Sequence, residues 1–330
     1  MHCAVVGAGA WGTALADLLA RNGHRTLLWA RESDVVDSIN ARHVNERFLA
    51  GAPLSPVLRA SGELGEAVDG AELVIFAAPS HVLRTVAKSA ASSVAPGATL
   101  AVASKGIERD TFALMTDVIA DELGDPGVVA VSGPSFAAEV AAGQPTAVVA
   151  ASAREAAALL AQRALSSSAF RVYTHDDVTG VELGGALKNV MAVASGMVEG
   201  LGLGFNSRAA LITRGLAEMT RLGVSLGAKP ATFAGLAGIG DLVLTCTGAL
   251  SRNRAVGVEV GKGRALDDVL AGKETVAEGV LNAQSAYALA ERQGVEMPIV
   301  QAVYRTLFAG RPAREAIAEL MMRELRAETD

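Results

Sequence analysis

Apolar residues follow different patterns in the two halves of the chain. In the first half, short apolar runs each end in small or polar residues, and helix-compatible segments lie between them. The runs occupy residues 2–6, 24–32, 72–80, 98–106, 127–135, 146–152 and 170–176, and two of the intervening segments are 36–49 and 111–123. This alternation predicts a doubly wound parallel sheet with helices on both faces and residues 170–176 as its edge strand.

The second half contains long runs rich in Ala, Leu and Met, with helical spacing of the apolar positions. These runs cover residues 178–201, 207–224, 282–294 and 298–310. We therefore expect an α/β doubly wound (Rossmann) domain over residues 1–176 and an all-α domain over residues 177–330.

Three glycines stand where the first strand gives way to the first helix. Gly7, Gly9 and Gly12 follow Val5 and Val6 and precede an Ala/Leu-rich run. At such a turn the first glycine allows a sharp bend, the second lets a pyrophosphate approach the backbone, and the third lets helix and strand pack closely. The helix also directs free N–H groups at the phosphates. The pattern predicts a dinucleotide site, and a glycine-rich turn without a ligand is the alternative.

Composition restricts the possible partners. The chain has 330 residues, of which 51% are hydrophobic and 19% are charged, which is typical of a globular protein long enough for two domains. Its 35 acidic residues outnumber its 29 basic residues, for a net charge of −6. We expect no nucleic-acid partner, because no basic face is evident. An anionic ligand would depend on a few local cations.

The cysteines and the N-terminus indicate a cytoplasmic protein. Cys3 and Cys246 offer neither a disulfide framework nor the spacing of metal ligands, so we expect no metal site. The first strand begins at residue 2, which leaves no room for a signal peptide. No apolar stretch reaches membrane-spanning length without a glycine or charged residue, so we expect no membrane span.

The end of the second strand bears on the choice of nicotinamide cofactor. NAD sites usually place Asp or Glu there to bind the ribose hydroxyls, whereas this strand ends at Arg31. A guanidinium can pair with a 2′-phosphate and lie on the adenine ring. Because Glu32 follows directly, and because Arg31 could be a solvated surface charge, the pattern favours NADP(H) and leaves NAD(H) open.

A lysine within an apolar, glycine-containing helix is the candidate catalytic residue. Lys188 shares a helical face with small residues such as Gly184, Gly185 and Ala192. Burial and a neighbouring cation would lower the pKa of its ammonium group toward neutrality, so that it could exchange a proton with a reacting oxygen. A lysine that extends to the surface is the alternative.

Two further segments supply polar groups that could join this lysine. Asp241 stands in a glycine-lined apolar stretch, where its carboxylate could hold the ammonium group of Lys188, and Lys105 at a strand end offers a second cation. The donor cluster Ser251, Arg252 and Asn253 is suited to phosphate oxygens. The alternative is that these residues form a helix N-cap followed by a surface arginine.

Several motifs in this order carry a family resemblance. GAGAWGTALA, ASKGIE, SGPSFAAE, GVELGGALKNVMAVA, GIGDLVLTC, SRNR and VAEGV resemble the bacterial NAD(P)-dependent glycerol-3-phosphate dehydrogenase family, from Val5 to about Pro298. GVELGGALKN with SRNR is far more specific than the glycine turn. The resemblance implies a Rossmann domain and a helical domain, the reversible reduction of dihydroxyacetone phosphate to sn-glycerol 3-phosphate for phospholipid synthesis, and a homodimer.

The resemblance also implies a role for individual residues. Lys188 resembles the general acid/base of the family. The substrate contacts that it implies are Lys105, Gly133, Ser135, Lys188, Asp241, Ser251, Arg252 and Asn253. The cofactor contacts, beside Gly7, Gly9 and Gly12 of the turn, are Ala10, Trp11, Arg31, Lys105, Ala137, Arg252, Val276 and Glu278. We expect Trp11 to pack against the cofactor loop, and a plain core residue is the alternative. Ala10 stands where Ser or Asn is common, and FLAG at residues 48–51 replaces FLPG or YLPG.

Two other functions remain open at this stage. β-Hydroxyacid and 6-phosphogluconate dehydrogenases also set a lysine on a helix after a Rossmann domain, and they would act on a different substrate. A regulator that senses NADP without catalysis would keep the glycine turn. It would have no need of Lys188, Asp241 and the Ser-Arg-Asn cluster together.

Overall fold

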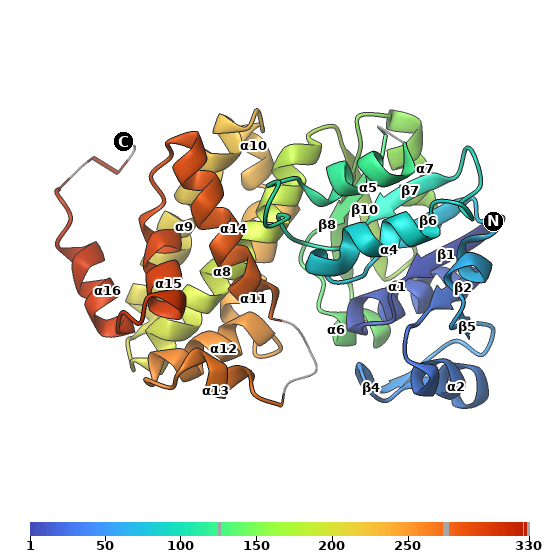
Figure 1. The fold of residues 1–330 in the computed structure, drawn as a ribbon, viewed down its shortest axis with the longest axis horizontal. Helices are drawn as coiled ribbons and strands as arrows, with labels where there is room; N and C mark the ends of the chain where they lie inside the picture. The colour runs from blue at the N-terminus through green and yellow to red at the C-terminus, as the bar shows by residue number, and fades with distance from the viewer. Residues whose placement is uncertain (125–126, 273–276, 326, 329–330) are drawn as a thin grey trace.

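The computed structural model describes residues 1–124, 127–272, 277–325 and 327–328. Figure 1 shows a sheet flanked by helices in one part of the molecule and a cluster of helices in the other. The long helix α8 (Val178–Gly200) begins the second part. Strand β10 ends at His175, so the predicted domain boundary after residue 176 falls in the connection between β10 and α8.

The first part is built on an eight-stranded sheet with the order β10-β9-β8-β7-β6-β1-β2-β5. Its strands are β1 (His2–Val6), β2 (Arg25–Trp29), β5 (Arg59–Ser61), β6 (Leu73–Phe76), β7 (Thr99–Val102), β8 (Val129–Ser132), β9 (Thr146–Ala151) and β10 (Phe170–His175). The doubly wound fold is confirmed, and β10 lies at the edge as predicted. The short edge strand β5 was not expected from the sequence.

The prediction of a wholly parallel sheet is wrong at β9 and β10. Strand β9 is antiparallel to β8, and β10 is parallel to β9, so these two strands run against the rest. The connection from β8 to β9 contains only the five-residue helix α6 (Ala137–Ala141), which is too short to carry the chain back along the sheet. The connection from β9 to β10 contains the eleven-residue helix α7 (Glu155–Leu165), which does so.

Helices cover both faces of the sheet because successive residues of a strand face opposite sides. In β1, Cys3 and Val5 pack in one apolar core with α1 residues such as Leu15, whereas Ala4 and Val6 pack in a second core with residues of α4 and α5. These helices are α1 (Ala10–Arg21), α2 (Ser33–Arg42), α3 (Leu64–Val68), α4 (Leu83–Ala90) and α5 (Met115–Leu123), and a 3-10 turn, η1 (Ser80–Val82), precedes α4.

The segment 36–49, which was expected to be helical, is helical only as far as Arg42. The chain then forms an antiparallel hairpin of β3 (Val44–Asn45) and β4 (Leu49–Pro53). The fully buried Asn45 donates hydrogen bonds to the carbonyl of Ala8 (2.9 Å) and to the hydroxyl of Thr13 (2.8 Å). These tertiary bonds hold the segment extended against its helical pattern.

The segment 111–123 begins its helix later than predicted. Helix α5 starts at Met115, because Leu114 pairs with Ile107 in an isolated antiparallel bridge. The residues between β7 and α5 therefore form a folded-back loop, which carries Lys105.

The second part packs its helices around α8, which is buried along most of its length. The other helices are α9 (Phe205–Ser225), α10 (Pro230–Phe233), α11 (Asp241–Thr247), α12 (Arg252–Gly261), α13 (Leu266–Leu270), α14 (Glu278–Gln293), α15 (Pro298–Phe308) and α16 (Ala313–Met321). Gly257 allows α12 to cross α8 closely, because a Cβ there would lie 2.0 Å from the carbonyl oxygen of Val193. The all-α prediction for the described part of this half is confirmed.

One stretch of the described residues, Pro230–Thr247, has the length and apolar composition of a membrane-crossing helix. It is not one continuous α-helix, because a π-helical turn, η2 (Leu236–Gly240), separates α10 from α11 and contains Gly238 with non-helical angles. The stretch also contains the fully buried carboxylate of Asp241, which is bound by two lysines. Its role in the fold is to place that carboxylate.

Candidate active site

The glycine turn has the shape that a dinucleotide requires. Gly7 has φ +115°, and a Cβ on Gly12 would lie 1.9 Å from the carbonyl oxygen of Gly7. Gly9 precedes α1, and a Cβ there would meet nothing within 4 Å. No side chain caps this helix, so its first N–H groups face the open space beside Gly9. The residues therefore fit a bound pyrophosphate.

Ala10 and Trp11 form the first turn of α1. The Trp11 ring packs against the apolar core of the first domain, as the core alternative proposed. Its buried Nε1 has no hydrogen-bond partner among the described residues.

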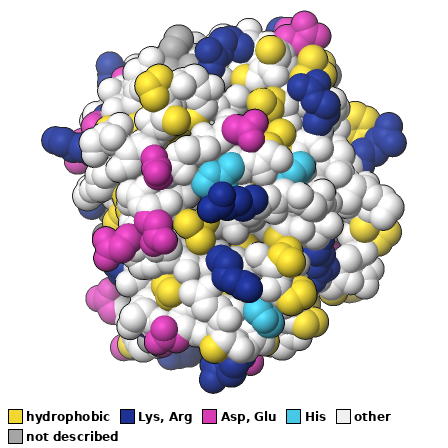
Figure 2. All heavy atoms as spheres, turned by 90° about the vertical axis from the view of Figure 1, so that its right-hand side faces the viewer, with side chains coloured by type: hydrophobic (Ala, Val, Ile, Leu, Met, Phe, Trp, Pro, Cys, Tyr) yellow, Lys and Arg dark blue, Asp and Glu magenta, His cyan; other side chains and the backbone are white. Residues whose placement is uncertain are grey.

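Arg31 lies just beyond β2, and its side chain is 81% exposed. Both its Nε and its Nη2 donate to the same carboxylate oxygen of Glu32, at 3.2 and 2.8 Å. An exposed pair of this kind is weak, so an incoming phosphate can compete for the guanidinium. Figure 2 shows the face of the sheet domain that lies away from the helical domain, where basic and acidic side chains are interspersed over the described surface.

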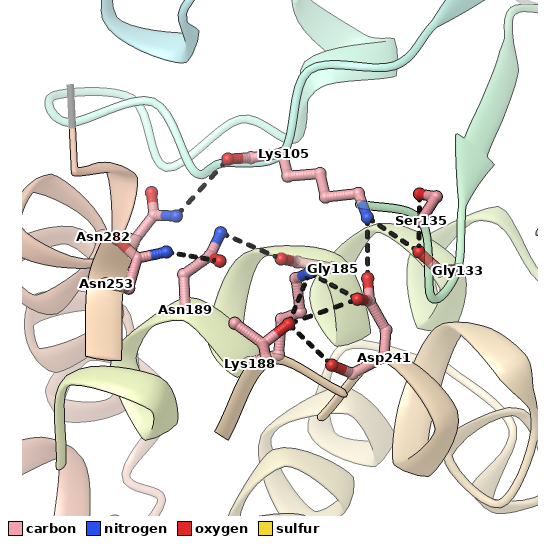
Figure 3. Close-up of polar contacts among 10 residues, drawn as sticks. Lys105, Gly133, Ser135, Gly185, Lys188, Asn189, Asp241, Asn253 and Asn282 are labelled. Atoms are coloured by element: carbon pink, nitrogen blue, oxygen red, sulfur yellow. Dashed lines mark hydrogen bonds and ion pairs between the residues drawn. The ribbon is translucent and has the colours of Figure 1, made fainter. Parts of the chain in front are cut away.

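The centre of the site is one carboxylate between two ammonium groups, as Figure 3 shows. Lys188 on α8 donates to one oxygen of Asp241 at 2.5 Å. Lys105, from the loop after β7, donates to the other oxygen at 2.6 Å and to the carbonyl of Gly133 at 3.2 Å. Asp241 is the first residue of α11 and is fully buried. The structure thus brings together three residues that lie far apart in the sequence.

The charges in this cluster are set by burial and by each other. Burial favours a protonated Asp241, but the ammonium groups of Lys105 and Lys188 outweigh it and hold the pKa of this carboxyl below its usual value. Burial lowers the pKa of Lys188 to about 8, with a further contribution from Lys105, while Asp241 opposes the change. Lys188 is therefore an ammonium group at neutral pH that can release its proton readily.

Thr245 is a second hydrogen-bond partner of Lys188, which the sequence interpretation missed. Its hydroxyl accepts from Lys188 at 2.8 Å and donates to the backbone carbonyl of Asp241 at 2.7 Å. The two residues are four apart on α11, which places them on one face of the helix. That spacing was the signal in the sequence.

The Ser-Arg-Asn cluster separates into three roles. Ser251 is the N-cap of α12 and accepts from the backbone N–H of Arg254 at 3.2 Å, as the N-cap alternative described. Arg252 is exposed in the first turn of the helix. Asn253 is buried, donates to the side-chain oxygen of Asn189 at 2.8 Å and accepts from the backbone N–H of Gly279 at 2.9 Å. Most of its carboxamide is thus engaged within the protein.

Three other predicted residues are Ser135, Ala137 and Glu278. Ser135 donates to the carbonyl of Gly133 at 3.0 Å, and Ala137 begins α6. Glu278 begins α14 and accepts from both the backbone N–H and the hydroxyl of Ser80, at 3.2 and 2.5 Å. Burial raises the pKa of the Glu278 carboxyl.

One predicted residue, Val276, lies outside the described residues. Ser80 and Asn282 were not predicted as site residues. Each makes a hydrogen bond between the sheet domain and the helical domain, Ser80 with Glu278 and Asn282 with Lys105. The amide nitrogen of Asn282 lies 3.4 Å from the carbonyl oxygen of Lys105 (Figure 3). In the described ranges no group of three or more His, Cys, Asp or Glu side chains is placed to hold a metal ion.

Comparison with known proteins identifies relatives over nearly the whole chain. Two family models match the chain: the NAD-dependent glycerol-3-phosphate dehydrogenase N-terminus over residues 2–158 and the C-terminus of the same family over residues 177–318. Glycerol-3-phosphate dehydrogenase [NAD(P)+] of Trichlorobacter lovleyi is 55% identical over 99% of both chains, and that of Geobacter sulfurreducens is 56% identical over 98% of both.

A solved structure gives the same result. The crystal structure of glycerol-3-phosphate dehydrogenase from Coxiella burnetii matches with a TM-score of 0.94 and 41% identity, covering 98% of this chain and 99% of that chain. The similarity therefore includes both the sheet domain and the helical domain.

Proposed function

The chain belongs to the NAD-dependent glycerol-3-phosphate dehydrogenase family, and from that premise we propose how its residues carry out the reaction. The protein is an NAD(P)-dependent oxidoreductase that interconverts dihydroxyacetone phosphate and sn-glycerol 3-phosphate. The observation that carries the residue assignments is the buried Lys188, held by Asp241 and Thr245 beside Lys105.

Lys188 is the general acid/base of this proposal. The nicotinamide cofactor supplies or accepts the hydride when it is bound. During reduction, the Nζ of Lys188 gives a proton to the carbonyl oxygen of the substrate, and it takes the proton back in the reverse direction. Asp241 and Thr245 hold the ammonium group in place. The charge of Lys105 stabilises the negative charge that develops on the oxygen.

The substrate phosphate is assigned to the start of α12. Arg252 offers a planar set of donors and is exposed there, while Ser251 fixes the helix end and Asn253 can contribute its remaining N–H. Ser135 and the backbone at Gly133 complete the proposed substrate contacts beside Lys105. Since the net charge of the chain is −6, local cations must attract the phosphorylated substrate.

The cofactor is assigned to the sheet side of the site. Gly7, Gly9, Ala10, Trp11 and Gly12 would hold the pyrophosphate at the start of α1. Lys105, Ala137, Arg252, Val276 and Glu278 are the further cofactor contacts that the family implies.

We propose NADP(H) as the preferred cofactor, with Arg31 as the residue that binds its 2′-phosphate. Arg31→Asp should raise the KM for NADPH far more than the KM for NADH, because a charge-assisted contact of about 1.5–3 kcal/mol is lost only with NADPH. Steady-state kinetics with both cofactors measures this. An equal effect on the two KM values would show that Arg31 does not select the cofactor.

The cellular assignments are proposals of the same kind. Two buried free cysteines, Cys3 and Cys246, support a reducing cytoplasm, and the product supports a role in glycerophospholipid synthesis. The homodimer depends on the family resemblance, and analytical ultracentrifugation of the purified protein would test it.

The test of the function follows NADPH and NADH absorbance with dihydroxyacetone phosphate. Wild-type protein should turn over, and Lys188→Ala should lower kcat by roughly 10²–10⁴-fold with cofactor affinity nearly intact. A Lys188→Ala variant with near-normal kcat would reduce Lys188 to a structural role. Turnover of 6-phosphogluconate would favour the rival dehydrogenase, and tight NADP binding without turnover would favour the regulator.

A further inference from the structure

A second buried carboxylate lies on the same helix as Lys188. Glu182 of α8 is 7% exposed, and its carboxylate accepts from the backbone N–H of Thr116 at 3.0 Å and from the Thr116 hydroxyl at 2.5 Å. Thr116 is in the first turn of α5, in the sheet domain. A buried carboxylate is costly unless it is well hydrogen-bonded, so this contact has a specific place in the structure. It joins the helix of the general base to the sheet domain.

The contact lies at one end of the loop that carries Lys105. This loop, residues 103–114, runs from the end of β7 to the start of α5. Its two arms are paired through Ile107 and Leu114. A contact that fixes the start of α5 therefore also fixes one arm of the loop. The position of the loop matters because the Nζ of Lys105 binds Asp241 in the other domain.

A small cavity lies between the loop and Glu182. Ser104, Lys105, Gly106, Ser132 and Glu182 line a small cavity of about 10 Å³, and the buried hydroxyl of Ser132 has no hydrogen-bond partner among the described residues. A space of this size holds about one water molecule. The loop is also held by the buried side chains of Ile107 and Leu114 and by the ion pair of Glu108 with Arg84. At the start of α5, the hydrogen bonds between Glu182 and Thr116 are the polar contact that joins it to α8.

A second carboxylate of the helical domain provides a comparison. Glu218 on α9 is 3% exposed and accepts from the backbone N–H groups of Ile299 and Val300, at the start of α15. It binds a helix start as Glu182 does, but both of its partners lie in its own domain. Among the residues that the structure describes, Glu218 has no hydrogen bond or ion pair with the loop of Lys105.

We infer that Glu182 is a positioning residue of the reaction: by binding Thr116 it fixes the 103–114 loop so that the ammonium group of Lys105 meets Asp241 beside Lys188. This inference depends on the proposed function for its kinetic part. Glu182 itself has no contact with the reacting atoms, and it acts through Lys105.

The test compares Glu182→Ala with Glu218→Ala in the full-length enzyme. Glu182→Ala should lower kcat/KM for dihydroxyacetone phosphate by at least about tenfold, because small displacements of a catalytic group are costly. The pH above which the reduction rate decreases should also be higher in this variant. Lys105 lowers the pKa of Lys188. If the ammonium group of Lys105 moves away while Asp241 stays beside Lys188, the pKa of Lys188 rises. Glu218→Ala should lower stability and leave the pH profile unchanged.

Conservative variants separate positioning from simple loss of structure. Glu182→Gln keeps a carbonyl oxygen for the Thr116 N–H and an N–H for the Thr116 hydroxyl, so it should restore most of the activity. Thr116→Val removes only the hydroxyl and should give a smaller loss with the same direction of pH shift. If Glu182→Ala does not fold, this variant carries the test.

Hydrogen exchange of the ligand-free protein gives a readout that does not depend on activity. Amides of residues 103–116 should exchange faster in Glu182→Ala than in Glu218→Ala. If the wild type fails to reduce dihydroxyacetone phosphate, the proposed function fails, while this comparison still tests the anchoring of the loop. An unchanged pH profile together with unchanged exchange in the loop would overturn the inference.

Discussion

At the scale of single residues, Asp241 has the most demanding role in the site. A fully buried carboxylate would be unstable alone, and each of its oxygens binds a different lysine. Because Lys105 lies beside the same carboxylate, it also lowers the pKa of Lys188. Lys188, the proposed general acid/base, is therefore held in place as an ammonium group whose pKa is low enough for it to lose its proton.

The first prediction concerns the pH dependence of the two directions. The pKa of Lys188 is lowered to about 8, so the ammonium form needed for reduction is lost as pH rises through that value. The rate of reduction should fall above about pH 8, and the rate of glycerol 3-phosphate oxidation should fall below it. Profiles of kcat/KM in both directions measure this. If the pH profiles of kcat/KM instead changed near 10.5, the ordinary pKa of a lysine, Lys188 would not be the group that titrates with a lowered pKa.

The second prediction concerns the phosphate. Remote phosphate binding can also align the carbonyl, so its loss should appear in kcat as well as in KM. Arg252→Ala should lower kcat/KM steeply for dihydroxyacetone phosphate and hardly change the feeble rate with dihydroxyacetone. Cofactor affinity is measured on the same variant, because Arg252 is also a proposed cofactor contact.

Arg254 provides the matched control for Arg252. It lies on the same helix, but its guanidinium binds Glu199 at 2.5 Å and the carbonyl of Gly248 at 3.1 Å. Arg254→Ala should therefore affect stability without discriminating between the two substrates. An equal loss with both substrates in Arg252→Ala would assign Arg252 to the cofactor or the fold.

At the scale of elements, local patterns predicted most of the structure, and long-range contacts explain the rest. The glycine turn and helix α8 were predictable from the spacing of their residues. Local backbone geometry requires the glycines, and burial requires the small and apolar residues of α8. The hairpin over residues 44–53 was missed, since Asn45 is held by Ala8 and Thr13, which are distant in the sequence. The direction of β9 depends on the short helix α6, whose length the apolar pattern did not reveal.

The same division applies to the candidate site. The proximity of Lys188, Asp241 and Lys105 was anticipated from their chemistry, and the structure brings them together. Asn282 was missed because a neutral side chain in a helix gives no sign of its partner. Thr245 was missed although it stands four residues after Asp241 on α11. Only the folded chain shows that Asn282 lies against the loop of Lys105.

The third prediction concerns the hairpin. Asn45→Ala should destabilise the protein by about 1–3 kcal/mol, because it removes the buried bonds that Asn45 donates to Ala8 and Thr13 and the acceptor of the Phe48 N–H. Asn40 makes two similar bonds to Ala60, both 2.9 Å, from an exposed position, so Asn40→Ala should cost less. Denaturant unfolding of the two variants gives the comparison. Equal losses would show that the buried bonds of Asn45 have no special weight.

At the scale of the whole molecule, the site exists only where the two domains meet. Lys105 belongs to the sheet domain, whereas Lys188 and Asp241 belong to the helical domain. Two similar contacts join the domains. In each, a glutamate of the helical domain accepts from the backbone N–H and the hydroxyl of one residue in the sheet domain: Glu182 from Thr116, and Glu278 from Ser80. The relative placement of the domains therefore determines the alignment of the proposed catalytic residues.

The last prediction concerns the dependence of overall stability on pH. Burial raises the pKa of Glu218 to about 7, whereas the ordinary value is 4.5. Between these values the folded protein binds more protons than the unfolded chain does, so this group makes the free energy of unfolding decrease as pH rises. Glu218→Gln removes that contribution, and other titrating groups are common to both proteins. The difference in unfolding free energy, wild type minus variant, should thus fall by a few kcal/mol between about pH 4.5 and pH 7 and level off above. Urea unfolding across this range measures the difference, and a difference that rises with pH would mean that the carboxylate is favoured by its site.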